Sequence, residues 1–132
     1  MRIDEDRCKT AYGVFPAAKH FPGIGHISQN TDTSATGITD GQLTAGDASL
    51  GTFKSATADH VRLMMVSSAM YPLIGPANQA VFSAAVITDL LRVKLGFDEV
   101  VITDDVGASR SGRDRSRLRG QDRCCCLART RC

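Results

Sequence analysis

The stretch Val100-Val101-Ile102-Thr103-Asp104-Asp105 is the part of the chain around which the rest can be interpreted. β-Branched, largely apolar residues run directly into adjacent carboxylates. A continuous apolar run of this kind is typical of a strand buried on both faces, as in a parallel sheet. The carboxylates would then lie at the carboxyl end of the strand, which is where parallel α/β folds carry their chemistry.

An amphipathic segment precedes this strand. Residues Ser83–Leu95 predict a helix, because the larger apolar side chains recur at helical spacing on one face. Ser83 is placed as its N-cap and Gly96 as the residue that ends it. A helix, a short glycine-containing loop, a buried strand and an acidic tip make up one unit of a parallel α/β fold.

Two motifs of the chain resemble glycoside hydrolase family 3, in particular its β-N-acetylhexosaminidase branch. One is Lys19-His20-Phe21-Pro22-Gly23, and the other runs from Ser83 through Leu95-Gly96-Phe97 to Asp105. The resemblance covers residues 13–108 and implies a fragment of a (β/α)8 TIM barrel, the C-terminal part of the catalytic domain. The chain has 132 residues, whereas a complete barrel of this kind takes about 250.

The remaining pattern fits such a fragment. We expect strands at Tyr12–Ala18, ending at Lys19-His20, and at Leu63–Val66, and a weak helix at Leu50–Asp59. Residues 26–46 are rich in Ser, Thr, Gly, Asn and Asp and predict a long binding loop, and residues 71–80 predict a second loop.

The last part of the chain differs in composition. Residues 1–106 carry 8 basic and 12 acidic side chains, a formal charge of −4, whereas residues 107–132 carry 8 arginines and 2 aspartates, a charge of +6. Four of the five cysteines lie in this tail, three of them consecutive, which is not a zinc-ligand spacing. We therefore assign residues 1–108 to the partial catalytic domain and 109–132 to a tail that is disordered or translated from a shifted frame; a nucleic-acid-binding arm is the alternative.

The acidic tip gives the resemblance its chemical meaning. A retaining glycosidase needs one carboxylate that attacks the anomeric carbon and a second group that protonates the leaving oxygen. The family's nucleophile falls on Asp104, and Asp105 would position the loop. Read without the resemblance, the same pair could simply cap the following turn.

The first motif supplies the other candidate residues. Lys19 and His20 match positions that bind sugar hydroxyls in the family; a salt-bridged lysine and a buried structural histidine are the alternative. The branch's acid/base Asp and His fall, without a gap, on Asn30 and Asp32, so Asp32 is the candidate acid/base. His26 is a second candidate for that role, and loop turns are the alternative for Asp32.

Several other features bound the function. Ser67 and Ser68 follow the strand at 63–66 and are expected to line the floor of the pocket. We expect no metal and no cofactor, because no ligand cluster or phosphate-binding glycine loop is present in the sequence. The expected partner is a carbohydrate, with no nucleic acid and no membrane, and we do not expect the charged N-terminus to act as a signal peptide. The resemblance implies a retaining β-N-acetylhexosaminidase-like enzyme, inactive as a truncated fragment, or else a non-catalytic carbohydrate-binding relative; family members are cytoplasmic or secreted.

Overall fold

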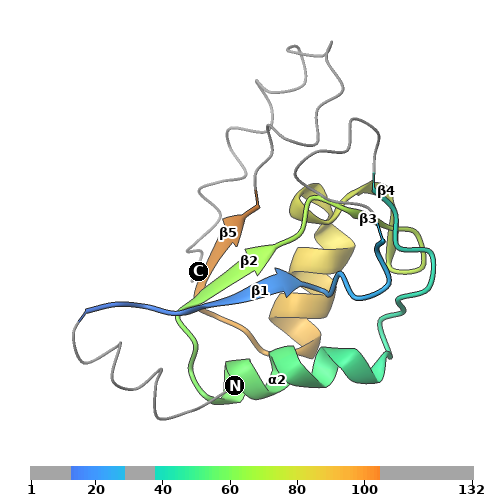
Figure 1. Cartoon of the computed structure of the whole chain (residues 1–132). Helices are drawn as coiled ribbons and strands as arrows, with labels where there is room; N and C mark the ends of the chain where they lie inside the picture. Colours follow the sequence, from blue (N-terminus) through green and yellow to red (C-terminus); the bar gives the residue numbers. More distant parts are fainter. Residues whose placement is uncertain (1–12, 29–37, 105–132) are drawn as a thin grey trace.

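The computed structural model describes residues 13–28 and 38–104, in which strands and helices alternate (Figure 1). The residues Asn30, Asp32 and Asp105 and the tail at 109–132, for which the sequence supports predictions, lie outside the described residues. The elements, in chain order, are β1 (Ala17–Phe21), the 3₁₀ helix η1 (Ala48–Leu50), α2 (Gly51–Ala58), β2 (Leu63–Val66), β3 (Met70–Tyr71), β4 (Gly75–Gln79), the 3₁₀ helix η2 (Ala80–Phe82), the π-helix η3 (Ala85–Lys94) and β5 (Val100–Thr103). The described part of the chain is therefore mixed α/β, as predicted.

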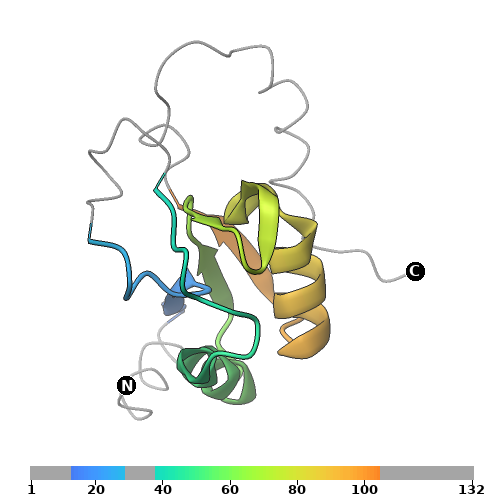
Figure 2. The same ribbon diagram turned by 90° about the vertical axis from the view of Figure 1, so that its right-hand side faces the viewer.

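A parallel sheet of three strands, in the order β1-β2-β5, forms the centre of the fold. β2 and β5 pair in continuous register, with Met64 opposite Val101 and Met65 opposite Ile102. Strands that follow one another in the chain are neighbours, and helical segments cross between them, which is the usual connection in parallel sheets. In Figure 2 the η3 helix lies beside the sheet and α2 crosses below it.

One face of the sheet packs against both helices. Along β2, Met64 and Val66 are fully buried, whereas Leu63 and Met65 are only half-buried. Phe21 at the end of β1 meets Phe53 of α2 edge to face, with ring centroids 5.2 Å apart. The same core takes in side chains of η3, namely Val86, Leu90 and Leu91. Burial of this single apolar face is what holds the three strands and two helices together.

The first strand begins and ends later than predicted. β1 covers Ala17–Phe21 instead of ending before Lys19-His20, and Val14 and Phe15 are exposed ahead of it. Pro16 has no backbone N–H to give to a neighbouring strand, so pairing starts only beyond it. As a result, Lys19 and His20 belong to the strand itself.

The segment predicted as a loop at 71–80 contains regular structure. β3 and β4 form a short antiparallel pair, with Met70 opposite Gln79 and Tyr71 opposite Gly75. The prolines at 72 and 76 hide this hairpin from a pattern search, because proline is unusual inside a strand. The hairpin stands at the carboxyl end of β2, where it becomes part of the candidate site.

Two local expectations need correction. β5 is not buried on both faces: Val100 is 41% exposed and the rest of the strand is half-buried, because within the described residues β5 pairs only with β2. The Ser83 side chain makes no capping bond; its carbonyl oxygen accepts hydrogen bonds from the Val86 and Ile87 amides instead. Gly96, at φ 73°, does take the predicted helix-ending role.

Candidate active site

The carboxyl ends of the three parallel strands lie together at one edge of the sheet (Figure 1). Backbone hydrogen bonds continue one residue past the ends of β2 and β5. The Ser67 amide donates to the Phe21 carbonyl at 2.8 Å, and the Asp104 amide donates to the Val66 carbonyl at 3.0 Å. This pairing fixes the backbone of Asp104 next to the end of β2. The candidate residues from two distant motifs are therefore held at one edge by the sheet.

His20 and Asp104 meet at this edge. Nε2 of His20 lies 3.8 Å from Oδ2 of Asp104, and their side chains are only 22% and 18% exposed. The distance is that of an ion pair when the imidazole is protonated and is too long for a direct hydrogen bond. The two motifs that the sequence singled out thus converge on one histidine–carboxylate pair.

Lys19 lies next to this pair in β1 and is exposed. Within residues 13–28 and 38–104 its ammonium group has no ion-pair partner. An exposed cation beside this pair offers a charged donor to a hydroxyl or carbonyl oxygen of a ligand. The part of the chain that the structure describes therefore offers no salt bridge in support of the alternative interpretation of this lysine.

Ser67 and Ser68 were predicted to line the floor of the pocket, but their packing does not fit that role. Both side chains are buried, Ser67 completely. Oγ of Ser67 accepts a hydrogen bond from the Ala69 amide at 3.1 Å and shapes the turn into β3. Ser67 is therefore a structural residue of the strand end rather than an exposed surface of a pocket.

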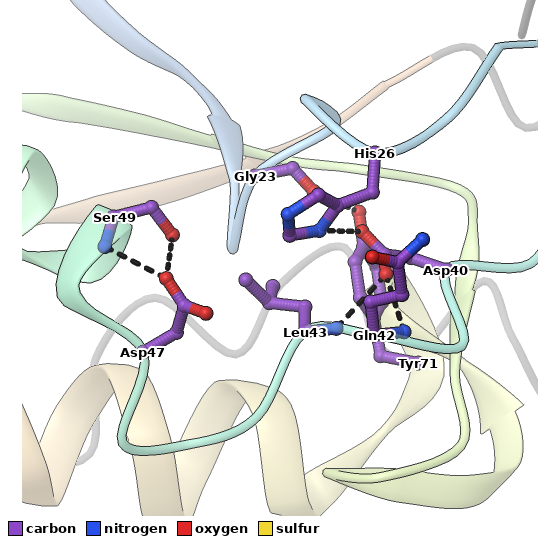
Figure 3. Close-up of polar contacts among 8 residues, drawn as sticks. All are labelled: Gly23, His26, Asp40, Gln42, Leu43, Asp47, Ser49 and Tyr71. Carbon is purple, nitrogen blue, oxygen red and sulfur yellow. Dashed lines mark hydrogen bonds and ion pairs between the residues drawn. The ribbon is translucent and has the colours of Figure 1, made fainter.

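A second polar cluster, which we call the Asp40 cluster, consists of His26, Asp40, Gln42 and Leu43 (Figure 3). Nδ1 of His26 lies 3.2 Å from Oδ2 of Asp40. The backbone amides of Gln42 and Leu43 both donate to Oδ1 of Asp40 at 2.9 Å. The carboxylate side chain is 1% exposed, whereas the His26 side chain is 39% exposed.

The Asp40 carboxyl is held in its ionised form. Burial alone would raise its pKa, but the amides of Gln42 and Leu43 and the His26 ring together outweigh burial, and the pKa of Asp40 is lowered from 3.8. A carboxylate with three donors is a stable anion even where water is largely excluded. His26 therefore faces a fixed negative charge.

The short strand β3 anchors both chain segments of this cluster. The phenol of Tyr71 donates to the Gly23 carbonyl at 2.8 Å, in the turn that follows β1. The Asp40 amide donates to the Met70 carbonyl at 2.9 Å, and the Met70 amide donates to the Ile38 carbonyl at 2.8 Å. Burial raises the pKa of Tyr71 to about 12, so the phenol keeps its proton and remains a donor. In Figure 3, Tyr71, Asp40 and His26 lie together beneath the Gly23 turn.

Sequence patterns did not single out Asp40 or Tyr71. Thr39-Asp40-Gly41 reads as an ordinary turn, and Tyr71 precedes a proline. Their partners are 14 and 48 residues away in the chain. No group of His, Cys, Asp and Glu suited to holding a metal ion occurs in the part of the chain that the structure describes. The same residues contain no helix long and apolar enough to cross a membrane.

Comparison with known proteins gives consistent matches. The family model for the glycosyl hydrolase family 3 N-terminal domain matches residues 5–122. A β-hexosaminidase of Stenotrophomonas maltophilia (strain R551-3) is 35% identical over 103 residues, which are 76% of this chain and 30% of that protein.

Solved structures agree with these sequence matches. The β-N-acetylhexosaminidase from Beutenbergia cavernae DSM 12333 superposes with a TM-score of 0.76 at 41% identity, over 83% of this chain and 32% of that one. A glycoside hydrolase family 3 β-N-acetylglucosaminidase from Paenibacillus sp. str. FPU-7 gives 0.71 at 29% identity, over 80% and 20%. The chain thus spans about a third or less of the length of these relatives.

Proposed function

Because the chain belongs to glycosyl hydrolase family 3, we propose that the complete protein is a retaining, β-N-acetylhexosaminidase-like glycoside hydrolase. Its substrate would carry a terminal β-linked sugar of the N-acetylglucosamine type, and a carbohydrate is the only partner we propose. The observation that carries this proposal is the meeting of His20 and Asp104 at the carboxyl edge of the parallel sheet.

Asp104 is the proposed nucleophile. Its carboxylate oxygen bonds to the anomeric carbon while the glycosidic oxygen leaves with a proton from the acid/base group. Water then attacks the anomeric carbon, gives its proton back to that group and releases Asp104. The rigid end of β5 suits this task, since its backbone is tied to β2 at Val66.

Lys19 and His20 are the proposed sugar-binding residues. Lys19 presents an exposed ammonium group, and His20 faces Asp104. Donors at these positions would hold the hydroxyl groups of the sugar so that its anomeric carbon lies over the Asp104 oxygen.

For the acid/base function we propose Asp32, which occupies the position of the branch's histidine in the gap-free comparison and lies outside the described residues. His26 is the second candidate. One observation favours it: the ring is half-exposed and is paired with the ionised Asp40. An imidazole oriented by a carboxylate is a common proton donor and acceptor in hydrolases.

The fold proposal is that the described elements are consecutive β/α units of a (β/α)8 barrel, with residues 1–108 forming the partial domain and 109–132 the tail. The parallel order β1-β2-β5, with helical crossings and one covered face, supports this proposal. On this basis the chain alone would be inactive, and a non-catalytic carbohydrate-binding role is the alternative.

The test uses a complete barrel. Residues 13–108 replace the matching segment of the Beutenbergia cavernae relative, which gives what we call the grafted enzyme. We expect it to hydrolyse an aryl β-N-acetylglucosaminide, and Asp104→Ala to abolish turnover. Asp98→Ala is the matched control, because Asp98 is an exposed carboxylate just before the opposite end of β5. Equal activity in Asp104→Ala and Asp98→Ala would refute the assignment.

A further inference from the structure

Asp40 is the one acidic or basic side chain that is buried among the residues that the structure describes. Burying a carboxylate is costly unless hydrogen bonds replace its hydration. Here the two amides and the His26 ring supply them, so neither carboxylate oxygen lacks a partner. Two of these donors are backbone amides that close a turn, whereas the third is the side chain of His26, which the turn itself does not need.

We propose that Asp40 is a positioning residue that fixes the His26 ring with its Nδ1–H toward Oδ2 and leaves Nε2 as the nitrogen offered to the sugar substrate. An ionised carboxylate can only accept hydrogen bonds, so the proton shared with Asp40 must sit on Nδ1 of the imidazole. In the neutral ring Nε2 is then an acceptor, and in the protonated ring it is a donor.

The location of His26 supports a role toward the substrate. The turn that carries it begins after Phe21, the last residue of β1, and is held by the hydrogen bond of Tyr71 to the Gly23 carbonyl. Nε2 of His26 has no bonded partner in the described ranges, and the side chain is 39% exposed. The ring is therefore fixed at one nitrogen, its side chain is partly exposed, and it belongs to the turn that follows the carboxyl end of β1, the edge of the sheet that also carries Asp104.

The inference rests on the proposed glycosidase function, and a double-mutant cycle in the grafted enzyme tests it. We expect Asp40→Asn to lower kcat/KM by about 10- to 100-fold, as is usual for residues that orient a functional group. His26→Gln should cost at least as much, and the double variant should be no worse than His26→Gln, because Asp40 acts only through the ring.

Asp47→Asn provides the matched control. Asp47 also accepts from a nearby backbone amide, that of Ser49 at 2.8 Å, but it is less buried than Asp40 and, within the described residues, neither hydrogen-bonds nor ion-pairs with a histidine. It should stay within about twofold of the parent. The positioning role would be overturned if the losses of kcat/KM from Asp40→Asn and His26→Gln multiplied in the double variant. It would also be overturned if Asp40→Asn had the same kcat/KM as Asp47→Asn. If the grafted enzyme kept its turnover in the Asp104→Ala variant, that result would instead overturn the proposed function itself.

A second measurement needs no turnover. Uniform ¹⁵N labelling of histidine, with His26→Gln to identify the signals of this ring, reports which nitrogen carries the proton. We expect a protonated Nδ1 and an unprotonated Nε2 in the neutral ring, and a shift toward the other tautomer in Asp40→Asn. A neutral His26 protonated at Nε2 in the parent protein would contradict the inference.

Discussion

At the scale of single residues, the Asp40 carboxylate sets the electrostatics of the loop. Its pKa is lowered because hydrogen bonds to the charged form outweigh the effect of burial. Such a lowered pKa contributes stability that is present above the unfolded-state pKa and is lost as the pH falls through the folded-state value.

Asp40→Asn makes this contribution measurable. At neutral pH the variant of the grafted enzyme should be less stable by about 1–3 kcal/mol, the usual worth of hydrogen bonds to a charged group. Since the unperturbed pKa is 3.8, the difference from the parent should be complete above that pH and shrink below it. Urea unfolding midpoints across a pH series give the comparison. A difference that does not change with pH would contradict the assignment.

The sequence indicated part of the site and missed part, for a physical reason. The resemblance singled out Asp104 and His20, and their meeting could be expected because both lie toward the carboxyl ends of parallel strands, which share one edge. Asp40 and Tyr71 could not, because their contacts depend on how the chain returns from residue 38 onto β3. No local pattern records that return.

At the scale of elements, the hairpin β3–β4 packs closely onto the start of η3. A Cβ atom added at Gly75 would clash with Oγ of Ser83 and lie 3.2 Å from Cβ of Ala85. Gly75→Ala should therefore destabilise the grafted enzyme by about 1–3 kcal/mol, as overpacking in a core does. Gly46→Ala is the control, because nothing lies within 4 Å of its added Cβ. Equal unfolding midpoints for the two variants would show that the approach is not tight.

His60, which follows the C-cap residue of helix α2, has a strained backbone conformation. His60 has φ 57°, and the amides of His60 and Val61 donate to the carbonyls of Thr57 and Ala56, which is the pattern of a glycine-type helix end. His60→Gly should stabilise the grafted enzyme by about 0.5–1 kcal/mol, because glycine adopts this conformation without the steric cost. Asp59→Gly is the control: because Asp59 has φ −81°, which any residue can adopt, this substitution should not raise the stability of the grafted enzyme. A lower melting temperature for His60→Gly than for the parent would refute this reasoning.

Sequence patterns placed some elements better than others. The strands at 63–66 and 100–103 have the predicted bounds, because continuous apolar runs mark parallel strands well. β1 was displaced by Pro16, and the β3–β4 hairpin was hidden by its prolines. In the η3 region the apolar face was predicted correctly, but its π-type hydrogen bonding was not, since the spacing of apolar residues does not distinguish the two helix types closely.

At the scale of the whole molecule, the sheet formed by the described residues has two unpaired edges. Within the described residues β1 and β5 each pair only with β2, and the face opposite the helices leaves Leu63 and Met65 half-buried. Open edges and half-covered parallel sheets favour association rather than a defined fold.

We therefore expect the chain of 132 residues alone to aggregate or pack loosely and to lack glycosidase activity. Near-ultraviolet circular dichroism, a thermal melt in the presence of reductant and an aryl β-N-acetylglucosaminide assay test this expectation. The grafted enzyme is the control, because in the proposed barrel both edges would be paired. A cooperative melt together with turnover by the isolated chain would contradict it.

The most direct test of the central claim, that Asp104 is the nucleophile, is to trap the covalent intermediate. The grafted enzyme is incubated with a slow fluorinated sugar substrate, digested, and the labelled peptide is sequenced by mass spectrometry. The mechanism predicts one sugar per enzyme molecule, attached to Asp104, the residue that follows β5. The Asp104→Ala variant should carry no label. A label on any other residue, or turnover without a trapped adduct, would contradict the claim.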